Sequence, residues 1–197
     1  MLAKAHITVG MAAAFTVIMP EDAAEALPVI AGASLGCLIC DIDCDNAVER
    51  TDSSHWRKVM ACIAAVSLAA DHLLDAGMWR TLAQSSPYVW AAGIAVFVLT
   101  CAFASVSSHR GFSHSLAALA LETVSIHLVF PAAAAPFAIA FITHLLLDIM
   151  NKRPVRLLYP VRKGFCLGWF YADRLADKVF AAAGSAWMLI AVIISLR

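Results

Sequence analysis

The sequence has little charge, and neither sign is in excess. Charged residues make up 14% of its 197 residues, 62% are hydrophobic, and 14 basic residues balance 14 acidic ones. A soluble domain has about 25% charged and about 45–50% apolar residues, so this composition is typical of an integral membrane protein. Because the net charge is zero, no overall field attracts nucleic acid, and we expect no nucleic-acid partner.

The sequence also lacks the pattern of a disulfide framework. Its six cysteines are scattered, most of them inside or beside apolar runs, which favours reduced, buried thiols. Cys37, Cys40 and Cys44 lie close together and include one C-x-x-C pair. No second pair of this kind follows, so a cysteine metal or redox site is the less favoured interpretation.

A cleavage site for a signal peptide is missing as well. Lys4 precedes an apolar run from Ile7 to Met19, but Pro20 and acidic residues follow this run directly, where small residues would be needed. We therefore expect the run to remain as an uncleaved first helix.

Seven segments are apolar enough to be considered as transmembrane helices, for which about 17–25 residues are needed. They are residues 3–19, 26–40, 58–77, 88–106, 116–130, 137–150 and 179–196. The second is rich in glycine, which indicates close helix contacts. A polar loop at 41–57, turns at 79–87 and 131–136, and a basic, aromatic stretch at 151–178 separate the segments. We predict an all-α integral membrane protein, with six to seven transmembrane helices in one bundle and residues 1–197 forming a single polytopic domain.

The distribution of basic residues predicts the orientation in the membrane. If the N-terminus is cytoplasmic and seven spans alternate, twelve of the 14 basic residues fall on the cytoplasmic side, and only Arg80 and Arg197 fall outside. This is the positive-inside bias of a multi-pass protein of the inner (cytoplasmic) membrane. The same assignment gathers the candidate polar residues at the cytoplasmic ends of the helices: His6, Asp41, Asp43, His109, His114, His144 and Asp148.

The most polar short stretch, residues 107–115, lies between two long apolar runs and must sit at an interface or line a wet cavity. His109 and His114 are five residues apart with Gly111 between them, which suits a bent connection on which both can reach one metal ion. Arg110 would then be placed to neutralise an anionic oxygen of a substrate. The alternative is an ordinary cytoplasmic loop.

Histidine and aspartate at helical spacing supply further candidate metal ligands. His144 and Asp148 are four residues apart, so they share one helix face, and this pairing commonly binds a divalent ion; the alternative is a buried hydrogen bond. Asp41 and Asp43 could ligate metal, or Asp43 could act as a base on metal-bound water; the alternative is a solvated acidic loop. His6 becomes a candidate ligand because the predicted topology places it on the same cytoplasmic side of the membrane as the other candidates.

These features together resemble a known family of membrane-bound, metal-dependent hydrolases, the YdjM/YbcI-type inner-membrane proteins. The resemblance is carried, in order, by His6, Gly32-Ala-Ser-Leu-Gly36, Asp41-Ile-Asp43, His109-Arg-Gly-Phe-Ser-His114-Ser115, His144-Leu-Leu-Leu-Asp148 and Pro160. The family usually has proline where this chain has Cys40. The order of histidines and aspartates also looks, more distantly, like that of zinc-dependent phospholipase C.

The resemblance implies a metal-dependent hydrolase of the inner membrane. We expect a divalent cation, zinc first and manganese or magnesium as alternatives, held by His6, Asp41, His109, His114, His144 and Asp148. The metal would lower the pKa of bound water toward about 7, with Asp43 and Arg110 assisting catalysis. Membrane lipids are the expected partners, and a lipid or lipid-linked (phospho)ester is the expected substrate. The alternatives are a metal or proton transporter and a non-catalytic membrane scaffold.

Overall fold

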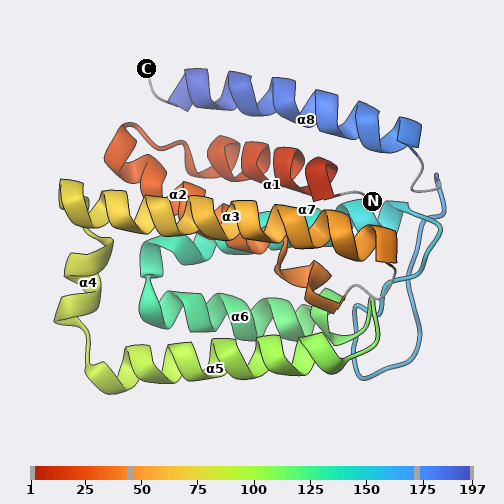
Figure 1. The fold of residues 1–197 in the computed structure, drawn as a ribbon, viewed down its shortest axis with the longest axis horizontal. Helices are drawn as coiled ribbons and strands as arrows, with labels where there is room; N and C mark the ends of the chain where they lie inside the picture. The colour runs from red at the N-terminus through yellow and green to blue at the C-terminus, as the bar shows by residue number, and fades with distance from the viewer. Residues whose placement is uncertain (1–2, 44–46, 171–173, 196–197) are drawn as a thin grey trace.

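The computed structural model describes residues 3–43, 47–170 and 174–195, and nearly all regular structure in these ranges is helical (Figure 1). The helices are α1 (Ala3–Ile18), α2 (Ala23–Gly36), η1 (Ile39–Asp43), α3 (Ala47–Leu74), α4 (Met78–Gln84), α5 (Pro87–Val106), η2 (Phe112–His114), α6 (Leu116–Val129), α7 (Pro131–Met150) and α8 (Arg174–Ser195). No β-strand is found in the described ranges, only two isolated bridges. The all-helical prediction is confirmed.

The long helices lie along one common direction and alternate in polarity, so their ends gather at two ends of the molecule (Figure 1). One end holds the starts of α1, α3, α6 and α8 and the final turns of α2, α5 and α7. The other end holds α4. Each of the seven predicted apolar segments corresponds to one of these helices. The alternation therefore brings every stretch with candidate site residues to the same end.

Four helices are long and apolar enough to cross a membrane: Ala23–Asp43, Pro87–Val106, Pro131–Met150 and Leu175–Ser195. A fifth span is formed if Ser54–Leu74 and Met78–Gln84, which meet at a bend of 77°, count together. The described helices thus give four or five spans, whereas the sequence predicts six to seven. The difference comes from α1 and α6, whose 16 and 14 residues extend only about 24 and 21 Å, short of a hydrocarbon core of about 30 Å.

Three connections that were predicted as loop or turn are partly helical, and these predictions were wrong. The loop at 41–57 contains the end of η1 and the start of α3, and the turn at 79–87 contains most of α4. The Asp71 carboxylate accepts hydrogen bonds from the backbone of Met78 and Trp79, both at 3.2 Å, and so caps α4. The turn at 131–136 is the start of α7, because Pro131 occupies the first turn, where no N–H bond is lost.

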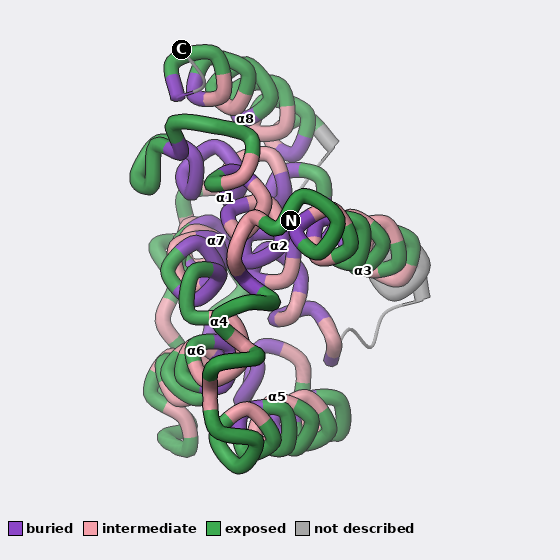
Figure 2. The backbone as a smooth tube through the Cα atoms, turned by 90° about the vertical axis from the view of Figure 1, so that its left-hand side faces the viewer, coloured by how far each residue is buried: buried purple, intermediate pink, exposed green. Residues whose placement is uncertain are grey.

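Small residues allow α1, α2 and α7 to pack closely. A Cβ added at Gly32 or Gly36 of α2 would overlap the backbone carbonyl of Ala133 or Phe137 on α7. This is the close contact that the glycine-rich second segment predicts. Figure 2 shows that buried residues concentrate on these helices, whereas α5 and α8 turn largely exposed faces outward. Those faces are apolar, with exposed side chains such as Val98, Leu99 and Ile190, as lipid contact requires.

We expect Gly36→Val to destabilise the protein. The added side chain must push α2 away from α7, and overpacking of this kind costs about 1–3 kcal/mol of unfolding free energy. Thermal unfolding in detergent measures the effect, with Ala92→Val as a control that places the same side chain on the exposed face of α5. Equal melting temperatures for the two variants would contradict the packing described here.

Candidate metal centre

Five segments bring all eight predicted site residues together at one end of the bundle. They are His6 on α1, Asp41 and Asp43 on η1, His109 and Arg110 in the loop after α5, His114 on η2, and His144 and Asp148 on α7. Seven of these side chains are buried, and His109 is partly exposed. Burial of so many ionisable groups requires compensating partners, and hydrogen bonds within the cluster supply only some of them.

Two histidine nitrogens face two carboxylates across a small central space. The Nε2 atom of His114 lies 3.8 Å from Asp41 Oδ1 and 3.3 Å from Asp148 Oδ2. The Nε2 atom of His144 lies 3.7 Å from Asp41 Oδ1 and 3.9 Å from Asp148 Oδ2. Tetrahedral zinc with bonds of about 2.0–2.2 Å separates neighbouring ligand atoms by about 3.3–3.6 Å. Both Nε2 atoms are buried, and neither has a hydrogen-bond partner among the residues that the structure describes, so the donors present suit a divalent cation.

The orientation of His144 is fixed by the end of α2. Its Nδ1 lies 2.7 Å from the backbone carbonyl oxygen of Cys37, which can only accept, so Nδ1 carries the proton and donates it. The lone pair of the ring is therefore on Nε2, the atom that faces Asp41 and Asp148. Metal-binding histidines are commonly held in this way. The close packing of α2 on α7 thus brings the Cys37 carbonyl to His144 and determines which ring nitrogen faces the carboxylates.

His114 is oriented by Ser113 and Asp43. The Ser113 hydroxyl donates to Asp43 Oδ2, and its oxygen lies 2.8 Å from Nδ1 of His114, from which it accepts. This arrangement again leaves the lone pair on the Nε2 atom of the histidine. Asp43 Oδ1 lies 2.9 Å from Nδ1 of His109. Both carboxylate oxygens of Asp43 are therefore engaged with groups that surround the central space. Ser113 was not among the site residues predicted from the sequence, although it directly precedes the predicted ligand His114.

We expect Ser113→Ala to weaken metal binding by about 10–100-fold, the usual effect of removing a partner that orients a metal-binding histidine. Equilibrium competition with a chelator measures the affinity. Ser105→Ala is the matched control, since Ser105 is exposed on α5 and bonds only within its own helix in the described structure. Identical affinities for the two variants would show that His114 does not need this link.

His109 forms a histidine–aspartate pair at the accessible edge of the site. Its side chain is 20% exposed, and its ring meets that of His114 edge-on, with centroids 5.4 Å apart. Burial lowers the pKa of His109, but the hydrogen bond and the negative charge of Asp43 outweigh this, so the pKa is raised above its ordinary value. His109 belongs to neither of the two closely spaced ligand groups found among the described residues. Its geometry suits proton transfer.

Arg110 holds Asp148 in place. Its Nη2 donates to Asp148 Oδ1 at 2.9 Å, and its Nη1 donates to the carbonyl oxygen of Arg153. The stretch after α7 supports this arrangement, because the backbone N–H of Arg156 donates to the carbonyl of Arg110. With Oδ1 held by the guanidinium, Oδ2 of Asp148 faces His114 and His144. The sequence predicted contact between Arg110 and an anionic substrate, whereas its observed partner is this carboxylate.

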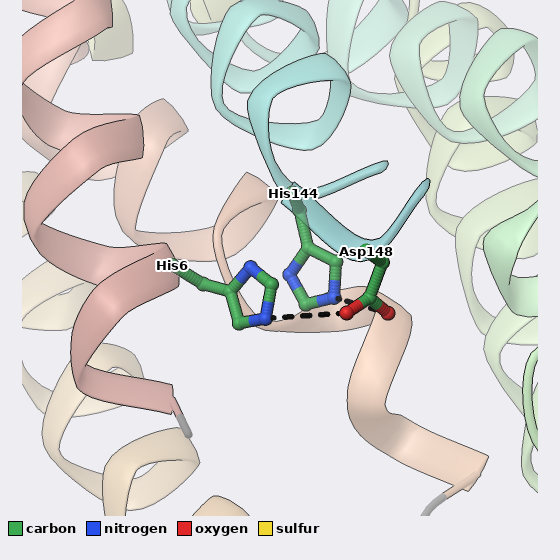
Figure 3. Close-up of side chains that lie close together, drawn as sticks. All are labelled: His6, His144 and Asp148. Carbon is green, nitrogen blue, oxygen red and sulfur yellow. Dashed lines mark ion pairs between the residues drawn. The ribbon is translucent and has the colours of Figure 1, made fainter. Parts of the chain in front are cut away.

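His6 approaches the same carboxylate from α1 (Figure 3). Its ring stacks on that of His144, with centroids 3.8 Å apart and an interplanar angle of 13°. Its Nε2 lies 3.6 Å from Asp148 Oδ1. The ligand atoms of His6, His144 and Asp148 form one closely spaced group, and those of Asp41, His114 and His144 form another. The two groups share His144, so they are parts of one centre.

Comparison with known proteins gives a single result, at the level of the family. The sequence model of the family described as YdjM inner membrane protein matches residues 1–196. The searches of curated proteins and of solved structures gave no match. The family match covers α1 to α8 and every residue of the candidate metal centre. The apolar helices agree with a membrane protein. The chain belongs to the YdjM inner membrane protein family.

Proposed function

We propose that the chain is a metal-dependent hydrolase that acts at the cytoplasmic face of the inner membrane on a lipid or lipid-linked (phospho)ester. One observation carries this proposal: the buried Nε2 atoms of His114 and His144, which have no hydrogen-bond partner in the described part of the chain, lie 3.3–3.9 Å from the carboxylates of Asp41 and Asp148. Orphaned nitrogens at this spacing are costly unless a cation joins them to the carboxylates.

The donor set favours zinc. Two imidazole nitrogens and two carboxylate oxygens are ligands that zinc accepts in four-coordinate sites, whereas manganese and magnesium prefer more oxygen. His6 would complete the ligand set, since its Nε2 lies 3.6 Å from Asp148 Oδ1 and belongs to a closely spaced group with His144 and Asp148. When bound, such an ion supplies Lewis acidity and lowers the pKa of water near it.

Each surrounding residue then has a defined task. His109, with Asp43 behind it, accepts a proton at Nε2, because its Nδ1 already donates to the carboxylate. Arg110 keeps Oδ2 of Asp148 directed at His114 and His144, so its role is to position this carboxylate and not to bind substrate. Ser113 keeps His114 in the tautomer that binds metal. The proposed proton acceptor is therefore the His109–Asp43 pair, not Asp43 alone.

A membrane-embedded bundle supports a substrate that arrives from the bilayer. We propose six to seven spans, with α1 and α6 as the short ones, and a cytoplasmic N-terminus. The basic residues support this orientation, since Lys4, Arg57 and Lys152 lie at the end with the metal centre and Arg80 lies at the other. The site then lies at the depth of lipid headgroups.

Transport of metal or protons is a second candidate, and one observation favours it. Glu122 on α6 is 2% exposed, and its Oε2 has no hydrogen-bond partner among the described residues. Buried carboxylates within apolar helices commonly line ion pathways. The main cluster, however, lies at the helix ends rather than near the middle of the bundle, where transporters usually place their sites. This position favours hydrolysis.

The test is to measure metal content and hydrolysis in the purified, detergent-solubilised protein. We expect near-stoichiometric zinc or manganese, and hydrolysis of at least one member of a panel of lipid phosphoesters that stops when metal is chelated and resumes when it is returned. A parent protein without metal, even after loading, would refute the proposal. Metal-loaded protein that moves metal across vesicle membranes but hydrolyses nothing would favour transport.

A further inference from the structure

An apolar groove runs along the bundle between α3 and α5. Figure 2, seen along the helices, shows α3 and α5 standing apart, with α2 beside α3 and nearer the centre of the molecule. A cavity of about 150 Å³ lies there, with a wholly apolar exposed surface. Its walls come from α2, α3, α5, α6 and α7, and include Ala31, Leu68, Ile94, Phe97 and Val129.

A second cavity continues the groove toward the metal centre. It measures about 160 Å³ and lies between α3 and the α2–η1 region, lined by residues that include Leu38, Ile39 and Met60. Both cavities are lined by Leu35, so they lie next to each other along α2 and α3. We call residues 31–39, 57–68 and 94–97 the α3–α5 groove.

The groove ends at a positive charge beside the candidate metal ligands. Arg57 lines the second cavity, and its Nη1 donates to the backbone carbonyl of Asp41 at 2.9 Å. That bond uses one of the five N–H donors of a guanidinium, and the others suit the oxygens of a phosphate. Asp41 in turn faces His114 and His144. An apolar track thus leads to a cation and then to the metal centre.

We propose that the α3–α5 groove holds one acyl chain of an anionic phospholipid, with its phosphate at Arg57. This inference rests on the proposed function, because it supplies the chain-binding part of a lipid substrate for the same centre. Membrane lipid is as apolar as the groove walls, so the groove positions the chain and adds little affinity. Selection of the lipid then depends on the headgroup, through the charge of Arg57.

Photo-crosslinking of full-length protein in vesicles tests the proposal. The vesicles contain phosphatidylcholine with a trace of phosphatidylglycerol that carries a diazirine on its acyl chain. We expect cross-links to concentrate on residues 31–39, 57–68 and 94–97, several-fold above the exposed face of α8. Arg57→Gln should abolish the preference for phosphatidylglycerol over phosphatidylcholine with the same chain. Even labelling of α5, α3 and α8 would overturn the proposal.

A matched pair of variants distinguishes lipid binding in the groove from general contact with membrane lipid. Ile94→Trp fills the groove from α5, where Ile94 is 46% exposed, and Ile190→Trp adds the same bulk on α8, where Ile190 is 56% exposed. We expect only Ile94→Trp to reduce cross-linking in the groove, with metal content unchanged in both variants. Equal labelling in the two variants would overturn the proposal. Groove labelling in a parent protein that binds no metal would refute the hydrolase alone and leave the groove standing.

Discussion

His144→Ala should abolish tight metal binding while His127→Ala leaves it unchanged. His144 belongs to both closely spaced ligand groups, so its removal affects the contacts to Asp41 and to Asp148 together. Loss of a partner that only orients a ligand lowers affinity by about 10–100-fold, and loss of the ligand itself should exceed about 100-fold. Metal analysis of the purified proteins, followed by competition with a chelator, measures the difference.

His127 is a suitable control because it is also a histidine on an apolar helix, but it is exposed and lies at the opposite end of α6 from the centre. The unfolding transition of each variant is recorded beside its metal content, so that a misfolded His144→Ala protein is recognised. Retention of metal by a folded His144→Ala variant would remove the basis of the proposed centre.

His109→Ala should keep the metal and lose hydrolysis. The ring of His109 faces Asp43 and lies outside both ligand groups, so its removal leaves the proposed ligands in place. A positioned general base contributes about 10²–10⁴-fold to rate, and we expect a loss of that size in kcat with little change in KM. Hydrolysis by metal-loaded protein, compared at equal metal content, measures the effect.

His55→Ala serves as the control for this variant, because His55 is an exposed histidine near the same end of the bundle. It should retain both metal and activity. If His109→Ala instead loses its metal as completely as His144→Ala, then His109 is a ligand, as the sequence predicted, and the assignment to proton transfer is wrong.

The helices were largely predictable because apolar runs of membrane length are a strong signal that depends on composition alone. The loops were less predictable, since helix can continue through polar or proline-containing sequence when local contacts support it. The segment 131–136 shows this: two prolines suggested a turn, yet the alanines between them favour helix, and Pro131 stands where its missing N–H does no harm.

The candidate site was predictable as a set of residues and not as an arrangement. His144 and Asp148 could be paired because four residues make one helical turn. No spacing rule places a histidine in a bent loop, so the sequence predicted both His109 and His114 as metal ligands. In the structure only His114 belongs to a closely spaced group of ligand atoms. The carbonyl of Cys37 was beyond sequence reasoning, because every residue has one and only packing selects this one.

The span of chain that contributes to the centre has a consequence for how the protein is made. His6 comes from the first helix and Asp148 from the seventh, so three quarters of the chain must be translated and inserted before the ligand set is complete. Metal would then join α1 to α7 as a late step of biogenesis and stabilise only chains that have reached it. Cells short of this metal should therefore contain less of the protein as well as less of its activity, because chains without it remain open to membrane proteases.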